Sequence, residues 1–236
     1  MSYGVLVKNS AGFVQIDQDY KNAVLLAAGS AYYTAPVTVP ASGIWGPPVT
    51  INFPTSLSPY KPLIFLRYFG GYQTYIVPQA ITQSSFSVSL ENWYDNPPGS
   101  GDFTWKYISG SFDYKVFGYK SSLLIDTYGL AIRNSTSVPV FSSAEIYTRV
   151  KAVIDTTIPR VINSNGLAKK QISYTAGGVN DFIYANLGST GFNGQMGDST
   201  SWRQMYRNVS PGMIEVAEPI PLNFSGASGA TMVINP

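Results

Sequence analysis

The chain has 236 residues, of which 44% are hydrophobic and 12% are charged, about half the charged share of roughly 25% in ordinary soluble proteins. The 15 basic and 13 acidic residues give a net charge of +2 without charged runs, so we expect neither nucleic acid nor membrane as a partner. The chain has no histidine and no cysteine, which excludes Ser-His-Asp and Cys-His catalysis, disulfides and the usual zinc sites. A surface with so few charges is poorly protected against association, which favours assembly.

Short runs rich in Val, Ile, Tyr, Phe and Thr alternate with glycine and proline along the chain, a pattern typical of antiparallel β-proteins. In the first half it predicts strands over residues 3–8, 13–17, 49–53, 63–68, 72–77, 84–91, 103–108 and 112–117. In the second half it predicts strands over residues 130–134, 138–141, 147–154, 169–174, 181–186, 203–208, 213–217 and 231–235. Gly70 and Gly71 tolerate the positive φ angles of a tight turn, so we predict a hairpin between residues 63–68 and 72–77.

A near-repeat marks the start of each half of the chain. Residues 3–10 read YGVLVKNS and residues 128–135 read YGLAIRNS, 125 positions later. In each copy a strand, a turn and a return strand follow one another, which predicts a β-hairpin. Gly12 stands where the turn needs left-handed backbone, and Ser137 takes its place in the second copy, where we expect a looser turn.

The duplication also predicts how the chain is divided. Each copy opens a unit of about the same length, so we expect two tandem antiparallel β-sandwich-like modules with long Pro/Gly-rich loops. The N-terminal module would comprise residues 1–124 and the C-terminal module residues 125–236. No apolar stretch reaches the roughly 20 residues of a membrane span, and the N-terminus lacks a signal-peptide pattern, so we expect synthesis in the cytoplasm.

The hairpin motif has an aliphatic alternation framed by Tyr-Gly, Asn and a turn glycine. Its residues are Tyr3, Gly4, Val5, Val7, Asn9, Gly12, Val14, Ile16 and Asp17 in the first copy, and Tyr128, Gly129, Leu130, Ile132, Asn134, Val140 and Phe141 in the second. The motif resembles one in small virion structural proteins of tailed bacteriophages, although the second copy has Ser137 for the glycine and Ser142 for the acid. The resemblance implies a structural role in a virion, at the tail tip, baseplate or fibre attachment, beside other virion proteins.

Several aromatic residues stand in stretches that we expect to be loops. Tyrosine and tryptophan offer a large contact area at low entropic cost, and interfaces favour them. We therefore predict a homo-oligomer, a trimer or a ring, whose contacts include loop aromatics, ahead of the alternatives that these residues are core or bind sugar. The candidates are Tyr32, Tyr33, Trp45, Trp93, Tyr94 and Trp202.

One loop combines aromatic rings with carboxylates. Trp93 and Tyr94 precede Asp95 and Asn96, and Asp102 closes the same Pro/Gly-rich stretch. Two carboxylates at a defined separation are what a glycosidase needs, and an aromatic platform beside them suits sugar binding. Asp and Asn are also ordinary turn formers, and we favour that interpretation. We expect no enzyme activity, no metal and no cofactor.

The leading hypothesis is a non-enzymatic bacteriophage virion structural protein. The first alternative is a receptor- or carbohydrate-binding module of a tail fibre or tip, which contacts host surface glycan through Trp93, Tyr94, Asp95 and Asn96. A capsid decoration protein shares the same physics of assembly. A glycan-degrading enzyme ranks last.

Overall fold

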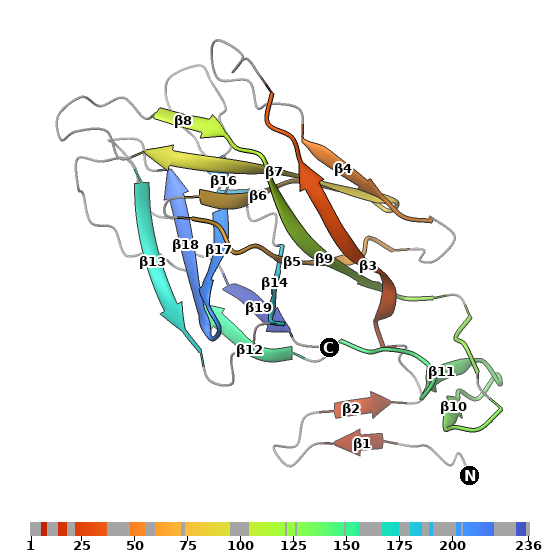
Figure 1. The fold of residues 1–236 in the computed structure, drawn as a ribbon. Helices are drawn as coiled ribbons and strands as arrows, with labels where there is room; N and C mark the ends of the chain where they lie inside the picture. The colour runs from red at the N-terminus through yellow and green to blue at the C-terminus, as the bar shows by residue number, and fades with distance from the viewer. Residues whose placement is uncertain are drawn as a thin grey trace.

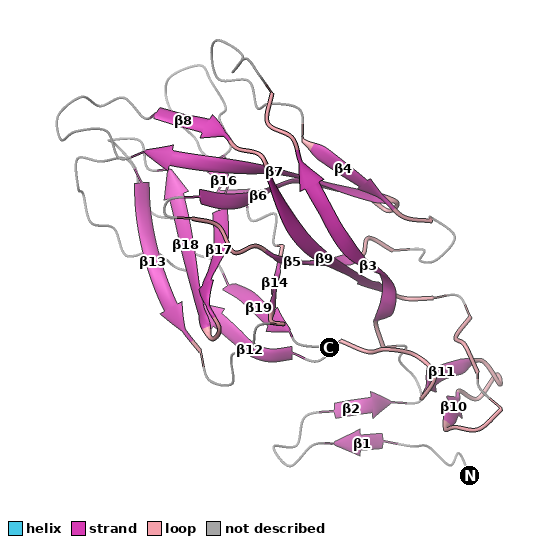
Figure 2. Ribbon diagram, viewed as in Figure 1, coloured by secondary structure: helices cyan, strands magenta, loops and turns pink. Residues whose placement is uncertain are grey.

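The computed structural model describes residues 6–8, 14–17, 22–36, 48–54, 60–71, 74–94, 104–120, 122–125, 127–148, 150–155, 167–174, 180–185, 189–190, 202–203, 205–219 and 230–234. All regular elements in these ranges are strands (Figure 2), so the prediction of an all-β fold is confirmed. No helix long and apolar enough to cross a membrane occurs within the same ranges.

The strands fall into two large sheets and three small two-stranded sheets, and every pairing is antiparallel (Figure 1). Sheet I has the order β12-β19-β14-β5-β9-β3, with β3 Val24–Tyr33, β5 Leu63–Arg67, β9 Gly110–Gly118, β12 Val150–Asp155, β14 Phe182–Tyr184 and β19 Ala230–Ile234. Sheet II has the order β13-β18-β17-β6-β7-β4, with β4 Val49–Asn52, β6 Thr74–Ile81, β7 Ser85–Tyr94, β13 Leu167–Ser173, β17 Met205–Ser210 and β18 Met213–Pro219; β8 Thr104–Tyr107 also pairs with β7. The small sheets are β1 Leu6–Lys8 with β2 Val14–Asp17, β10 Ala131–Arg133 with β11 Pro139–Ser142, and β15 Ser189–Thr190 with β16 Trp202–Arg203.

The two large sheets pack face to face around one core. Alternate residues of each strand point inward, so β7 contributes Phe86, Val88 and Leu90 while its neighbours in sequence face the other way. Sheet I contributes residues such as Ile64 and Val116 to the same cluster. The antiparallel sandwich-like class is therefore confirmed.

The two halves of the chain do not fold as separate modules, which corrects the expectation of two tandem sandwiches divided at residues 124 and 125. In sheet I, β14 of the second half pairs with β5 of the first; in sheet II, β17 pairs with β6 in the same way. The core cluster likewise contains residues of both halves, among them Ile64 and Val216. An isolated half would expose a strand edge in each sheet and half of the core, so the burial of apolar area requires both halves together.

The two halves of the chain are related by a pseudo-twofold arrangement of strands, as the sequence repeat suggests. Six strands of the first half, β3, β4, β5, β6, β7 and β9, correspond in chain order to β12, β13, β14, β17, β18 and β19 of the second. When each strand is exchanged for its counterpart, the order of both sheets reads the same from the opposite end. The sequence boundary near residue 124 thus separates two topological units that share their sheets.

The two repeat hairpins have the same register. The partners in β1 and β2 are Leu6 with Asp17, Val7 with Ile16 and Lys8 with Val14, and those in β10 and β11 are Ala131 with Ser142, Ile132 with Phe141 and Arg133 with Pro139. Every pair of the second set lies 125 positions after its counterpart, and both ladders shift register at the same step. The predicted structural repeat is therefore confirmed in the described strands. Both hairpins lie at one end of the molecule in Figure 1.

The segments that follow the hairpins pair with each other. Leu25 N donates to Ile146 O at 2.7 Å, Thr148 N donates to Ala23 O at 3.5 Å, and Val24 is bridged to Tyr147. Ala23 and Thr148 are themselves 125 positions apart, so one pair of this short ladder joins equivalent positions of the two repeats. It links the beginning of β3 to the segment just before β12, at the two opposite edges of sheet I.

The predicted hairpin at Gly70 and Gly71 is wrong, because β5 and β6 belong to different sheets. The chain between them crosses from one layer of the sandwich to the other. A Cβ atom at Gly70 would lie 2.3 Å from Thr74 Oγ1 and 2.4 Å from the ring of Tyr68. A glycine is needed there for close packing at the crossing.

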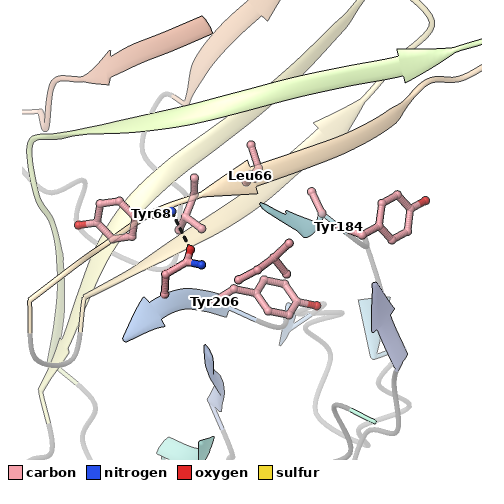
Figure 3. Close-up of a pocket in the computed structure, with 8 residues that line it drawn as sticks. Leu66, Tyr68, Tyr184 and Tyr206 are labelled. Atoms are coloured by element: carbon pink, nitrogen blue, oxygen red, sulfur yellow. Dashed lines mark hydrogen bonds between the residues drawn. The ribbon is translucent and has the colours of Figure 1, made fainter. Parts of the chain in front are cut away.

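A small cavity remains between the sheets (Figure 3). It is lined by Leu66, Tyr68, Ile76, Ile183, Tyr184, Ala185, Tyr206 and Asn208. The cavity has a volume of about 10 Å³, close to the least that one water molecule needs. This cavity is a packing gap between the two sheets and is too small for an organic ligand.

Candidate protein-interaction surface

Exposed apolar side chains are concentrated in one short part of the chain. Of the eleven large hydrophobic residues that are exposed among the described residues, six lie between positions 124 and 146. They are Leu124, Ile125, Tyr128, Leu130, Val138 and Ile146, and we call them the hairpin surface. Tyr128 is 91% exposed and Leu124 is 62% exposed. Clustered exposed apolar groups are typical of surfaces that bind another molecule.

The turn of the second hairpin is built around Asn134. Its Oδ1 accepts hydrogen bonds from Thr136 N at 3.1 Å, Thr136 Oγ1 at 2.8 Å and Val138 N at 2.9 Å. Ser137 N donates to Asn134 O at 2.9 Å, and Ser137 has a φ of 64°. This serine adopts the left-handed backbone expected at the position of Gly12 in the first copy. The turn thus holds the strands of the surface at a defined register.

Replacing Ser137 by Gly is expected to stabilise this hairpin by about 0.5–1 kcal/mol, because glycine has no Cβ penalty in left-handed backbone. Native-state hydrogen exchange of the Asn134, Ser137 and Val138 amides should slow by roughly twofold to fivefold. Ser137→Ala, which keeps a Cβ, is the matched control and should bring no such protection. Equal exchange rates in the glycine and alanine variants would contradict the role assigned to the backbone.

Contacts at the base of the second hairpin explain why the motif has a glycine at position 129. Leu130 N donates to Ser143 Oγ at 2.9 Å, and Ser143 N donates to Leu130 O at 2.8 Å. A Cβ atom at Gly129 would lie 2.5 Å from Ser143 Oγ. Glycine therefore leaves room for the serine hydroxyl that fixes the start of the strand, beside two residues of the hairpin surface.

Glu145 anchors the chain that leads into the hairpin. Its carboxylate binds Lys120 Nζ at 2.8 Å and accepts a hydrogen bond from Leu124 N, also at 2.8 Å. The Glu145 side chain is 3% exposed, so this ion pair is largely shielded from solvent screening. The contact fixes the backbone of Leu124 to the side chain of Glu145, the residue before Ile146.

Tyr147 connects the hairpin to the segment that pairs with β3. Its hydroxyl accepts a hydrogen bond from Ser142 N at 2.7 Å, and its ring stacks on Phe141 with 4.8 Å between centroids. Burial raises the pKa of the Tyr147 hydroxyl, and the nearby charge of Glu145 raises it further, against the opposing effect of the hydrogen bond at Ser142. The hydroxyl is therefore neutral at physiological pH.

The structure separates the aromatic residues that the sequence grouped as loop residues. Tyr32 and Tyr33 are the last residues of the ten-residue strand β3, so their predicted loop context is wrong. Tyr32 is 60% exposed and remains open to a partner, whereas Tyr33 is 1% exposed. The Tyr33 ring lies 6.1 Å from that of Tyr107 within the core. Tyr33 is a core residue, and its burial is intramolecular.

The other predicted site residues are only partly described. The backbones of Trp93 and Tyr94 form the end of β7, and that of Trp202 lies in β16, so these three are strand residues and their predicted loop context is wrong. Trp93 pairs with Trp105 in β8, and Tyr94 with Thr104. Trp45, Asp95 and Asn96 lie outside the described residues. The sugar-binding alternative at Trp93 and Tyr94 stays a prediction.

The hairpin surface was not among the residues singled out from the sequence. Tyr128 and Leu130 belong to the repeat motif, and strand alternation assigns such residues to faces without telling which face stays uncovered. The signal that points to the surface is local composition. Between residues 122 and 148 the chain has three charged residues, Asp126, Arg133 and Glu145, among many apolar ones.

Glu215 is a buried carboxylate in β18 of sheet II. Glu215 accepts hydrogen bonds from Arg207 Nε at 2.8 Å, Tyr75 OH at 2.8 Å and Gln171 Nε2 at 2.9 Å. Burial alone would raise the pKa of Glu215, but these hydrogen bonds and the charge of Arg207 outweigh it and hold the pKa below its ordinary value. The carboxylate stays ionised, and both of its oxygens accept hydrogen bonds.

A second ion pair lies on sheet I. Asp113 Oδ2 binds Arg67 NH2 at 2.7 Å, and Asp113 also accepts a short hydrogen bond from Ser30. Partial burial by itself would raise the pKa of Asp113. The hydrogen bonds from Ser30 and Arg67 and the charges of Arg67 and Lys115 outweigh this effect, so the pKa lies below its ordinary value. Arg67 NH1 also binds Asn180. The cluster ties β3, β9 and β5 to the residues before β14.

We compared the chain with protein-family models, curated proteins and solved structures, and none of them matches it.

Proposed function

We propose that this protein is a non-enzymatic structural component of a bacteriophage virion, assembling at the tail tip, baseplate or fibre attachment. The observation that carries the proposal is the hairpin surface, six large apolar side chains exposed within positions 124 to 146. A surface of this kind lowers its free energy when a partner removes it from water. It lies on the second copy of the hairpin whose motif resembles those of virion proteins.

Two further features support a role in assembly. The low charge of the chain places little electrostatic repulsion in the way of close contact between subunits. The carboxylates Asp113, Glu145 and Glu215 are each bound to a cation and to further donors, as expected of structural ion pairs. Such carboxylates are unsuited to acid–base catalysis, because it needs a group free to exchange a proton with substrate.

The proposal is tested by asking whether the protein enters particles. Phage particles purified by density gradient should contain the protein in stoichiometric amounts by mass spectrometry. A Tyr128→Ser variant supplied in place of the natural chain should be depleted from particles roughly tenfold or more, because it removes a large exposed contact residue. The matched Tyr60→Ser variant, which changes the same residue type at 64% exposure outside the hairpin surface, should be retained. Absence of the natural chain from particles would refute the proposed function.

A further inference from the structure

We propose that the hairpin surface binds a second copy of this chain, with the β10–β11 hairpins of the two copies packed against each other across a twofold axis. This proposal rests on the assembly function above and names the partner of the same surface. An isologous contact presents one patch to itself, so the patch must be self-complementary in polarity and in charge.

The hairpin surface meets the polarity requirement. Its six residues are apolar or aromatic, and each is at least 36% exposed. Like apolar patches bury each other without leaving polar groups unpaired. The nearest described backbone groups are already bonded, since Leu130 pairs with Ser143 and Asn134 pairs with Val138. Two copies can therefore approach side chain to side chain.

The charges around the surface also allow a like partner. Glu145 is buried and neutralised by Lys120, so it presents no charge to a neighbour. The Arg133 guanidinium is held back on its own turn by a 2.9 Å hydrogen bond to Ser137 O. The two described charged residues of this segment are therefore both held by contacts within their own chain.

The two copies of the repeat already pair with each other within one molecule. Equivalent elements of the two halves pair antiparallel in three places, β5 with β14, β6 with β17, and Ala23 to Leu25 with Ile146 to Thr148. Ile146 takes part in the third contact and also belongs to the hairpin surface. The surface therefore continues outward from an existing twofold contact between repeats, and a second copy extends the same kind of contact between molecules.

Sedimentation velocity of the purified full chain over a concentration series tests the proposal. The natural chain should show a reversible monomer–dimer equilibrium, and Tyr128→Ser and Leu130→Ser should each weaken it by roughly tenfold or more. Tyr60→Ser, at a tyrosine that is 64% exposed and lies outside the hairpin surface, should leave the dimer unchanged. A natural chain that is monomeric throughout, or a dimer lost in Tyr60→Ser and kept in Tyr128→Ser, would overturn the proposal.

A second measurement does not depend on weakening variants. The chain has no cysteine, so Ser135→Cys in the exposed turn accepts a single spin label. Dimers paired through the hairpins should give one defined distance between labels, and its absence from a dimeric sample would place the contact elsewhere and overturn the proposal. A monomeric chain that still enters particles would refute this inference and leave the proposed function standing. If the protein forms a hairpin-paired dimer but is absent from particles, the inference stands and the proposed function is refuted.

Discussion

Replacing Arg207 by Met is expected to lower the free energy of unfolding by about 3–5 kcal/mol, because the change strands a buried carboxylate without its cation. The Arg207 and Glu215 side chains are 8% and 6% exposed, and Nε lies 2.8 Å from Oε1. The two residues are cross-strand partners in β17 and β18. Arg207 NH1 also donates to Gly71 O at 2.6 Å, so the guanidinium ties sheet II to the crossing between the sheets.

Urea unfolding followed by circular dichroism measures this loss. The control is the double variant Arg207→Met with Glu215→Gln, which removes the charge and keeps a side-chain carbonyl for Tyr75; the new NH2 group faces Gln171, whose own amide can turn to accept from it. It should recover more than half of the lost stability, since the largest cost is an unpaired buried charge. A double variant no more stable than Arg207→Met alone would show that packing, and not charge, sets the cost.

Acid provides an independent check on the same pair. The folded-state pKa of Glu215 is below its ordinary value of 4.5, so the ion pair stabilises the protein above that pH and the contribution is lost as the pH falls through the folded-state pKa. In Arg207→Met the lowering groups are reduced and burial raises the pKa of Glu215 instead. The difference in stability between the natural chain and the variant should therefore be smaller at about pH 4 than at pH 7.

Replacing Asn208 by Ala is expected to lower the free energy of unfolding by about 3 kcal/mol, because Asn208 joins the two sheets. Its Oδ1 accepts a hydrogen bond from Tyr68 N at 3.0 Å, shown as the dashed line in Figure 3, and its backbone N donates to Tyr68 O at 2.7 Å. Asn208 lies in β17 of sheet II, and Tyr68 directly follows β5 of sheet I. Asn208 is 3% exposed, so the truncation leaves a buried amide of Tyr68 without its acceptor and enlarges the cavity.

Chemical unfolding gives the magnitude, and hydrogen exchange gives the location. In Asn208→Ala the Tyr68 amide should lose its protection more than the amides in the centre of β7 do. Asn180→Ala is the matched control, because Asn180 is exposed and accepts one bond from Arg67; it should cost less than about 1 kcal/mol. If Asn208→Ala and Asn180→Ala lower the free energy of unfolding by similar amounts, the hydrogen bonds of Asn208 between the sheets do not account for its stabilising effect.

Local features of the fold were predictable wherever the physics is local. The hairpin repeat is predicted by side-chain alternation and turn chemistry, and the register of Val7 with Ile16 recurs in Ile132 with Phe141. The left-handed turn position also follows from the repeat, since Ser137 takes the place and the backbone conformation of a glycine. Each predicted strand overlaps an observed one, because β-branched and aromatic residues fit a half-buried pleated surface.

Strand β3 was not predicted, although it is one of the two longest. Its sequence VLLAAGSAYY has small residues in the middle and no alternation. The small residues are explained by the neighbouring strand, since a Cβ at Gly29 would lie 2.9 Å from the hydroxyl of Tyr114, its partner in β9. The fit of a large side chain over a small one depends on which strands become neighbours, and the sequence of β3 alone carries no sign of it.

The sequence by itself determined the all-β class, the duplicated hairpin and the residue types available for contact, because alternation, turn preference and composition act over a few neighbouring residues. Only the tertiary structure decided that the two halves share both sheets, that Tyr33 is buried while Tyr32 is exposed, and that Tyr128 and Leu130 remain uncovered. These outcomes depend on pairings between residues more than a hundred positions apart, such as β5 with β14. Many strand orders satisfy the same local preferences, and the burial of one common core selects among them.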